Sequence, residues 1–167
     1  MIKKFIYLLT FAIISIFAFS CGENKTGNTG SLTIIHMNDT HGRDEEEIII
    51  TKGDNPQTNH KYGAARRATY IKEVKATNDN VLILHAGDTI TGSVYSTVFK
   101  GRDEVDIMNM IGVDAATIGN HFVDYGLENF TEIMKERKFP TLSINIKNKS
   151  DGSLYATPYI ITNVNGL

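Results

Sequence analysis

The chain has 167 residues, a length that suits a single domain. Its 19 acidic and 17 basic side chains give a formal net charge of −2, which provides no electrostatic argument for a nucleic-acid partner. Apolar residues make up 41% of the sequence, an ordinary share for a globular protein. The sequence contains a single cysteine, Cys21, so an intrachain disulfide is excluded.

The N-terminal segment, residues 1–20, has the features of a secretory signal peptide. Two lysines precede an apolar stretch over residues 5–19, which is short for a membrane span of roughly 20 residues. Residues 18–22 resemble a bacterial lipobox, which implies that Cys21 carries a lipid and anchors the protein in the bacterial cell envelope, in the periplasm or at the cell surface. Plain secretion and an uncleaved anchor are the alternatives.

The first part of the remaining chain predicts a tether followed by a strand and a loop. Residues 21–30 are rich in Gly, Asn, Thr and Lys and predict a flexible tether, with the folded domain over residues 31–167. An apolar run predicts a strand over residues 32–37. The acidic run at residues 44–47 is expected to be solvated, with a secondary cation site as the alternative. Residues 53–62 predict a solvated loop.

The rest of the chain alternates between helix and strand patterns. Arg66 and Arg67 lie in the first predicted helix, where we expect them on an exposed face, with a phosphate contact as the alternative. The alternation predicts βαβ units and a mainly parallel sheet with helices on its faces, an α/β fold. The predicted helices are residues 63–77, 103–111 and 127–138, and the predicted strands are 81–86, 115–118, 141–146 and a candidate at 159–164.

Short polar clusters follow three of the predicted strands. They occupy residues 38–41, 87–88 and 119–121. In open α/β sheets, ligands bind at the edge where the strands end. Carboxylate, amide and imidazole groups are the ligands that divalent cations take in proteins. The three clusters therefore predict most of a two-metal site.

The residue types within the clusters suit distinct roles at such a site. Asp39 and His41 are two residues apart, so on an extended backbone both side chains would point at the same cation. Asp88 has two carboxylate oxygens, enough to bridge metals held about 3.5–4 Å apart. Asn120 offers a neutral amide oxygen to a second metal.

His121 and Asp124 predict a pair that handles protons. The two residues are three positions apart, so one helical turn would bring the carboxylate beside the imidazole. A carboxylate there raises the pKa of the imidazole and fixes its tautomer. The pair suits a group that must be cationic near a developing oxyanion or a leaving oxygen.

The motifs at residues 35–42, 84–89 and 118–126 resemble those of the calcineurin-like metallophosphoesterases. The match is to the secreted 5′-nucleotidase branch, which includes 2′,3′-cyclic-nucleotide phosphodiesterases, and it covers about residues 31–146. The resemblance implies the N-terminal half of a two-sheet sandwich flanked by helices. It also implies two divalent metals (Mn²⁺, Zn²⁺, Fe²⁺ or Mg²⁺) and in-line attack by an activated water on a nucleotide or another phosphate ester.

The resemblance also assigns roles to individual residues, and this chain departs from the pattern of the family in some respects. In this family a Gly-His-x-His motif supplies further ligands and a C-terminal domain binds the nucleoside, but no histidine follows His121. His85 stands where an aspartate is common, and we expect it to be structural. The chain is therefore expected to need a missing C-terminal half, and a non-catalytic fragment is the alternative to an active hydrolase. The implied metal ligands are Asp39, His41, Asp88 and Asn120, and the implied catalytic pair is His121 with Asp124.

Overall fold

The computed structural model describes residues 30–167, so the predicted signal peptide, the lipidation site Cys21 and residues 21–29 of the tether lie outside the described residues. Residues 31–167 form one compact unit. Among the described residues, no helix has both the length and the apolar character needed to cross a membrane.

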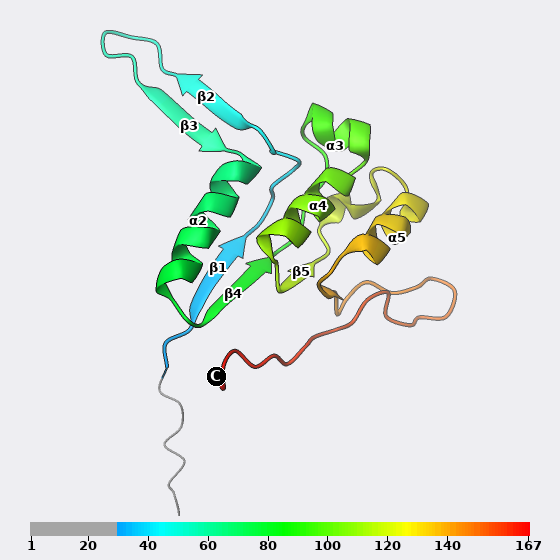
Figure 1. The fold of residues 1–167 in the computed structure, drawn as a ribbon. Coiled ribbons are helices and arrows are strands. Elements are labelled where there is room, and N and C mark those ends of the chain that lie inside the picture. Colours follow the sequence, from blue (N-terminus) through cyan, green and yellow to red (C-terminus); the bar gives the residue numbers. More distant parts are fainter. Residues whose placement is uncertain (1–29) are drawn as a thin grey trace, which may run out of the picture. The chain divides into compact units, whose positions relative to one another are not determined.

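The main sheet consists of four parallel strands in the order β1-β4-β5-β6 (Figure 1). Because all four run in the same direction, their carboxyl ends lie along one edge of the sheet. The α/β class and the parallel sheet expected from the sequence are confirmed. The strands are β1 (Thr33–Met37), β4 (Val81–His85), β5 (Ala115–Thr117) and β6 (Thr141–Leu142).

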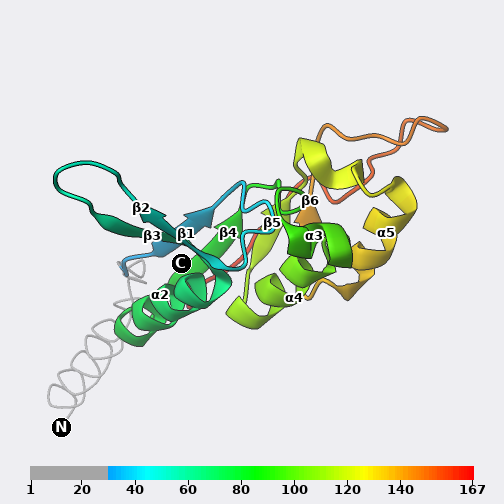
Figure 2. The same ribbon diagram turned by 90° about the horizontal axis from the view of Figure 1, so that it is seen from above.

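One face of this sheet packs against three helices, α2 (Ala64–Thr77), α4 (Arg102–Ile111) and α5 (Leu127–Glu136). All three contribute to a single hydrophobic core with the strands, and Figure 2 shows them on the same side of the sheet. The expected packing of helices against a mainly parallel sheet is therefore confirmed, and in the described residues these three helices lie on one face. The buried members of the core are Ile71, Ile83, Val105, Met108, Val113, Ala116, Phe130, Ile133 and Phe139.

The opposite face of the sheet, called here the open face, has no helix packed on it among the described residues. Side chains alternate along β1, so Ile35 packs toward the core whereas its neighbour Ile34 is 56% exposed. His36, Leu84 and Leu142 line an apolar hollow on this part of the sheet. Parallel sheets are usually covered on both faces, so the open face is an unusual feature of this chain.

A β-hairpin replaces part of the loop predicted at residues 53–62. Strands β2 (Glu46–Ile50) and β3 (Thr58–Tyr62) pair in an antiparallel manner, which limits the loop to residues 51–57. The prediction was wrong at residues 58–62 because these polar residues lack an apolar alternation. Backbone hydrogen bonds to β2 hold them in place instead.

Other boundaries differ more modestly from the predictions. A short helix, α3 (Val94–Phe99), is capped at its N-terminus by Ser93, whose side chain accepts a hydrogen bond from the backbone N–H of Ser96. The strand predicted at residues 141–146 is limited to β6. The candidate strand at 159–164 is wrong, since Leu142 and Thr157 form only an isolated bridge just before it.

A buried polar layer lies between α2, α4 and the segment that follows β1. Glu104 is only 1% exposed, and the Arg67 guanidinium lies 3.4 Å from both of its carboxylate oxygens. Arg67 also lies 3.7 Å from Asp44 Oδ1. Arg66 pairs with Glu46 at the surface. The expected exposed arginine face and solvated acidic run are therefore wrong for Arg67 and Asp44, which the fold draws inward.

The carboxyl groups of Asp44 and Asp103 also lie in this layer, where they have too few hydrogen-bond donors around them. Neither carboxylate oxygen of Asp103 has a hydrogen-bond partner, although both are buried. Burial and the adjacent Asp44 raise the pKa of Asp103 to about 6, and burial also raises the pKa of Asp44. A proton shared between the two groups would supply the missing donor.

Replacement of Asp103 by asparagine should stabilise the fold in a pH-dependent manner. The folded-state pKa of about 6 lies above the ordinary value of 3.8, so the ionised carboxylate destabilises the fold above pH 6, and this penalty fades as the pH falls toward 4. In thermal unfolding followed by circular dichroism, Asp103→Asn should melt above the parent near neutral pH and together with it in mild acid.

The matched control is Asp106→Asn, which changes an exposed carboxylate on the same helix and should leave the melting temperature almost unchanged at every pH. A difference in melting temperature between Asp103→Asn and the parent that does not vary with pH would contradict this interpretation.

Because the open face is exposed, substitutions at two adjacent residues of β1 should differ in their effect on the free energy of unfolding. Ile34→Glu should change the free energy of unfolding by no more than about 0.5 kcal/mol, because this side chain is already largely exposed. Ile35→Glu should cost on the order of 3 kcal/mol, because it places a carboxylate against the core. Urea denaturation of the two variants measures the difference in free energy of unfolding, and equal losses of stability in both would show that the open face is covered.

Candidate metal centre

The candidate site lies at the carboxyl edge of the parallel sheet, where the segments after β1 and β4 run side by side. The backbone N–H of Asp39 donates to the carbonyl oxygen of Gly87 at 3.0 Å, and that of His41 donates to the carbonyl oxygen of Asp88 at 3.1 Å. These bonds extend the β1–β4 pairing beyond both strands. The first two polar clusters of the sequence are thereby fixed against each other.

The backbone of Asp39, His41 and Asp88 adopts the left-handed conformation. The φ angles are +52° for Asp39, +49° for His41 and +52° for Asp88. Residues other than glycine rarely adopt this conformation, which costs on the order of 1–3 kcal/mol at each position. The expectation that Asp39 and His41 converge along an extended strand is therefore wrong, since a tight turn brings them together.

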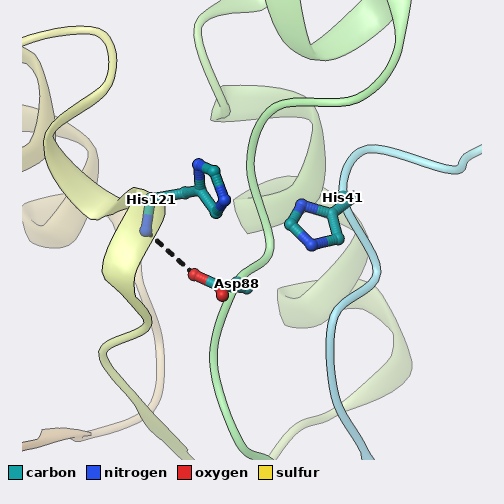
Figure 3. Close-up of side chains that lie close together, drawn as sticks. All are labelled: His41, Asp88 and His121. Atoms are coloured by element: carbon teal, nitrogen blue, oxygen red, sulfur yellow. Dashed lines mark hydrogen bonds between the residues drawn. The ribbon is translucent and has the colours of Figure 1, made fainter.

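Three side chains from three different segments converge at this edge (Figure 3). Ligand atoms of His41, Asp88 and His121 all lie within 4.8 Å of one another. Two imidazoles and a carboxylate at this spacing form a donor set that suits a divalent cation such as Zn²⁺, Mn²⁺ or Fe²⁺. The residues present therefore fit a bound metal ion.

The orientation of His41 leaves one ring nitrogen free for a metal. Its Nδ1 lies 3.1 Å from the carbonyl oxygen of Ile90, which can only accept, so Nδ1 must carry the proton. In the neutral ring, Nε2 then presents a lone pair. Asp39 Oδ1 lies 3.7 Å from this nitrogen. Two electron-rich atoms facing each other in this way would be stabilised by a cation between them.

Asp88 is held by its surroundings at the centre of the cluster. Its Oδ1 accepts a hydrogen bond of 3.0 Å from the backbone N–H of His121. A Cβ atom on Gly119 would lie 2.0 Å from the same oxygen, so only glycine allows this close approach. Gly87 has a φ of +102°, a conformation open to glycine, so the chain can turn sharply directly before Asp88.

His121 and Asp124 form the pair that their spacing suggested. His121 lies on the short 3-10 helix η1 (Asn120–Val123), and its Nδ1 is 2.7 Å from Asp124 Oδ2. This hydrogen bond raises the pKa of His121. The rings of His41 and His121 meet edge to face with their centroids 5.2 Å apart.

The position of His121 is compatible with two roles. A histidine that binds a metal must be neutral, whereas one that donates a proton to a leaving oxygen must be protonated. The raised pKa favours the second role, as the sequence analysis proposed, even though His121 belongs to the metal-compatible cluster. Asn120 is exposed at the start of η1, and its role as a ligand of a second metal stays a prediction.

His85 lies beneath the site, and the structure supports its interpretation as a structural residue. It is 3% exposed, its Nδ1 accepts a 3.1 Å hydrogen bond from the backbone N–H of Gly87, and its Nε2 lies 3.3 Å from Thr40 Oγ1. Burial lowers its pKa to about 4. The ring is therefore neutral near pH 7 and is directed away from the cluster.

Arg137 is a half-buried cation near Asp88 that the sequence analysis missed. It lines a hollow together with Asp88, and its guanidinium lies over the rings of Phe130 and Phe139 at 5.6 and 5.7 Å from their centroids. Burial lowers its pKa to about 10. A single arginine directly after a helix gives no sequence signal for such a position, because most arginines there are exposed.

Comparison with known proteins identifies the family. A model of the calcineurin-like phosphoesterases matches residues 32–166. The chain is 42% identical over 138 residues to the snake venom 5′-nucleotidase of Gloydius brevicauda, covering 80% of this chain and 23% of the relative. It is 40% identical over 119 residues to human 5′-nucleotidase, covering 71% of this chain and 21% of the relative.

A solved structure gives the same answer at the level of the fold. The NAD nucleotidase of Haemophilus influenzae superposes with a TM-score of 0.70 at 33% identity, over 81% of this chain and 24% of that protein. The chain thus spans about a quarter of the length of the relatives it matches. On the evidence of the family model, these relatives and the shared fold, the chain belongs to the calcineurin-like phosphoesterases, a family of phosphate-ester hydrolases.

Proposed function

We propose that this chain supplies the N-terminal part of the catalytic domain of a 5′-nucleotidase-type phosphoesterase, which removes phosphate from nucleotides in the bacterial cell envelope. The observation that carries the proposal is the convergence of His41, Asp88 and His121 at the carboxyl edge of the sheet, beside the His121–Asp124 pair. The family membership supplies the reaction class, phosphate-ester hydrolysis.

The proposed cofactor is a pair of divalent metal ions. Asp39 and His41 would hold the first ion, Asp88 would bridge both, and Asn120 would contact the second. When bound, such ions supply positive charge to the phosphate oxygens and lower the pKa of water. The 3.7 Å approach of Asp39 to the lone-pair nitrogen of His41 supports the first assignment.

The protein's own acid–base group in this proposal is His121. The Asp124 carboxylate accepts from Nδ1, fixes the ring orientation and favours the protonated form. A protonated His121 can stabilise developing negative charge on a phosphate oxygen or donate to the leaving oxygen through Nε2. Asp124 therefore acts through His121 and need not contact the substrate.

The substrate class rests on the relatives. Two of them are named 5′-nucleotidases and a third is named an NAD nucleotidase, so a nucleotide is the proposed substrate. A 2′,3′-cyclic nucleotide is the alternative, and it would use the same metal-binding edge. We propose no nucleic-acid partner, because the chain is slightly acidic overall.

Two observations support a second candidate, that this chain is not catalytic without further polypeptide. The chain spans about a quarter of its relatives, and its parallel sheet has an open face lined by Ile34, Leu84 and other apolar side chains. The remaining half of the catalytic domain would cover such a face and would add ligands to the second metal. In that case the described residues bind metal weakly and do not turn over substrate.

Lipid attachment at Cys21 would hold the proposed enzyme at the membrane surface. The support is the sequence around Cys21, where an apolar stretch ends in small residues. A tether over residues 21–30 would then separate the lipid from the folded unit.

Metal-dependent hydrolysis by the purified chain is the direct test of activity. AMP, 2′,3′-cyclic AMP and a chromogenic phosphate ester are offered with Mn²⁺, Zn²⁺ or Mg²⁺. Turnover by the parent should fall by roughly 10²–10⁴-fold in His121→Ala, because an acid–base group is lost. In Asp124→Asn the alkaline limb of the pH–rate profile should move to lower pH, because the bond that raises the pKa of His121 is removed.

The control for these variants is His60→Ala, which removes an exposed histidine of the hairpin and should leave turnover unchanged. Absence of turnover in the parent, together with fewer than one metal ion bound per chain, would favour the non-catalytic candidate. Turnover that survives His121→Ala would contradict the proposed acid–base role.

Labelling with a palmitate analogue tests the proposed anchor. Cells that express the full chain should incorporate the label, and Cys21→Ser should abolish it, because no other cysteine is present. An unlabelled parent protein found in the culture medium would instead show plain secretion.

A further inference from the structure

Two hydrogen bonds of the buried His85 ring connect the two metal-site segments, which lie above helix α4. Gly87, directly before Asp88, donates its backbone N–H to His85 Nδ1 at 3.1 Å. The opposite ring nitrogen of His85 lies 3.3 Å from the Thr40 hydroxyl oxygen. The Thr40 hydroxyl also lowers the pKa of the Glu104 carboxylate on α4, so these two side chains lie close together. The connection therefore crosses from the segment after β4 to the segment after β1.

The direction of each bond in this connection is fixed by chemistry. A backbone N–H can only donate, so His85 Nδ1 must accept and the proton of the neutral ring resides on Nε2. Nε2–H then donates to Thr40 Oγ1, which leaves the hydroxyl proton of Thr40 free to donate to Glu104. Each of the two bonds of the His85 ring therefore has one donor and one acceptor.

Glu104 is a fixed anchor for this connection. Its side chain is 1% exposed and pairs with Arg67 of α2, whose guanidinium lies 3.4 Å from both carboxylate oxygens. Burial raises the pKa of Glu104, while Arg67 and the Thr40 hydroxyl lower it. Two helices therefore hold the carboxylate in place beneath Thr40.

The segment around Thr40 requires such an anchor. Thr40 lies between Asp39 and His41, and both of these residues have φ near +50°. A backbone in this region persists only where surrounding contacts determine it. Besides backbone bonds to Gly87, Asp88 and Thr89 and the contact of the His41 ring with the Ile90 carbonyl oxygen, the Thr40 side chain ties this turn to the layer beneath it.

We propose that Thr40 and His85 are positioning residues, which hold Asp39 and His41 against Asp88 in a geometry ready for metal binding through the hydrogen bonds that join Thr40, His85 and Gly87. The metal-binding part of this inference rests on the proposed function. The geometric part does not, since it concerns the chain without any ion. Neither side chain contacts the metal or the substrate in this role.

Thr40→Val tests the geometric part in the metal-free chain, because valine keeps the shape and removes the hydroxyl. Amide hydrogen exchange should be about fivefold to tenfold faster at Asp39 and His41, the amides that donate to Gly87 and Asp88. Thr40→Ser, which keeps the hydroxyl, should restore parent rates. Unchanged exchange in Thr40→Val would overturn the proposal.

The matched control is Thr33→Val at the other end of β1. Thr33 Oγ1 donates to Asn78 Oδ1 at 3.1 Å, so this variant also loses a partly buried hydroxyl bond. It should leave exchange at Asp39 and His41 at parent rates, even where it lowers the melting temperature. Equal acceleration in both variants would show a general loss of stability and would overturn the positioning role.

Mn²⁺ titration followed by electron paramagnetic resonance tests the metal-binding part. Thr40→Val and His85→Phe should each weaken Mn²⁺ binding by roughly 10–100-fold, the usual effect of losing a group behind a metal ligand. The double variant should be no weaker than the worse single one, because both changes break one connection. Parent-like Mn²⁺ affinity in Thr40→Val, or fully additive losses, would overturn this role.

Failure of the proposed function gives a different pattern of results. A parent chain that binds no Mn²⁺ would contradict the metal site itself. The exchange rates at Asp39 and His41 would then still decide, on their own, whether Thr40 positions this segment.

Discussion

The pairing of β1 with β4 is the interaction on which the candidate site depends. The register places Met37 opposite His85, and the same pairing continues past both strands through backbone bonds that join Asp39 to Gly87 and His41 to Asp88. Two clusters far apart in the sequence therefore face each other at a fixed distance. A shift of one residue in this register would turn the side chains away and dissolve the site.

The acidic side chains beneath the site and those at the edge of the sheet differ in the hydrogen-bond donors that surround them. Beneath the site, Arg67 serves Glu104, whereas Asp44 and Asp103 remain short of donors, and burial raises the pKa of both. At the edge of the sheet, Asp39 faces a nitrogen that bears a lone pair in neutral His41. A shared proton would resolve the first shortage, whereas a metal ion would suit the second, because the carboxylate of Asp88 converges there with the imidazoles of His41 and His121.

The one-sided sheet connects the fold to the question of activity. Helices α2, α4 and α5 bury one face, and the apolar open face lacks such a layer among the described residues. The site lies at the carboxyl edge of this sheet, beside the open face. The open face therefore bears on the stability of the fold and, in the proposed second candidate, on whether the metal centre is complete.

The sequence by itself determined the family and the α/β class, and it indicated the polar clusters that meet at the candidate site, because strand ends and their polar clusters are local patterns. It also indicated the His121–Asp124 pair, since three residues make one helical turn. Only the tertiary structure decided the left-handed turn at Asp39, the hairpin at residues 46–62 and the bonds from Thr40 and His85 to the core. These features depend on partners distant in the chain, and such partners leave no periodic signal in the residues themselves.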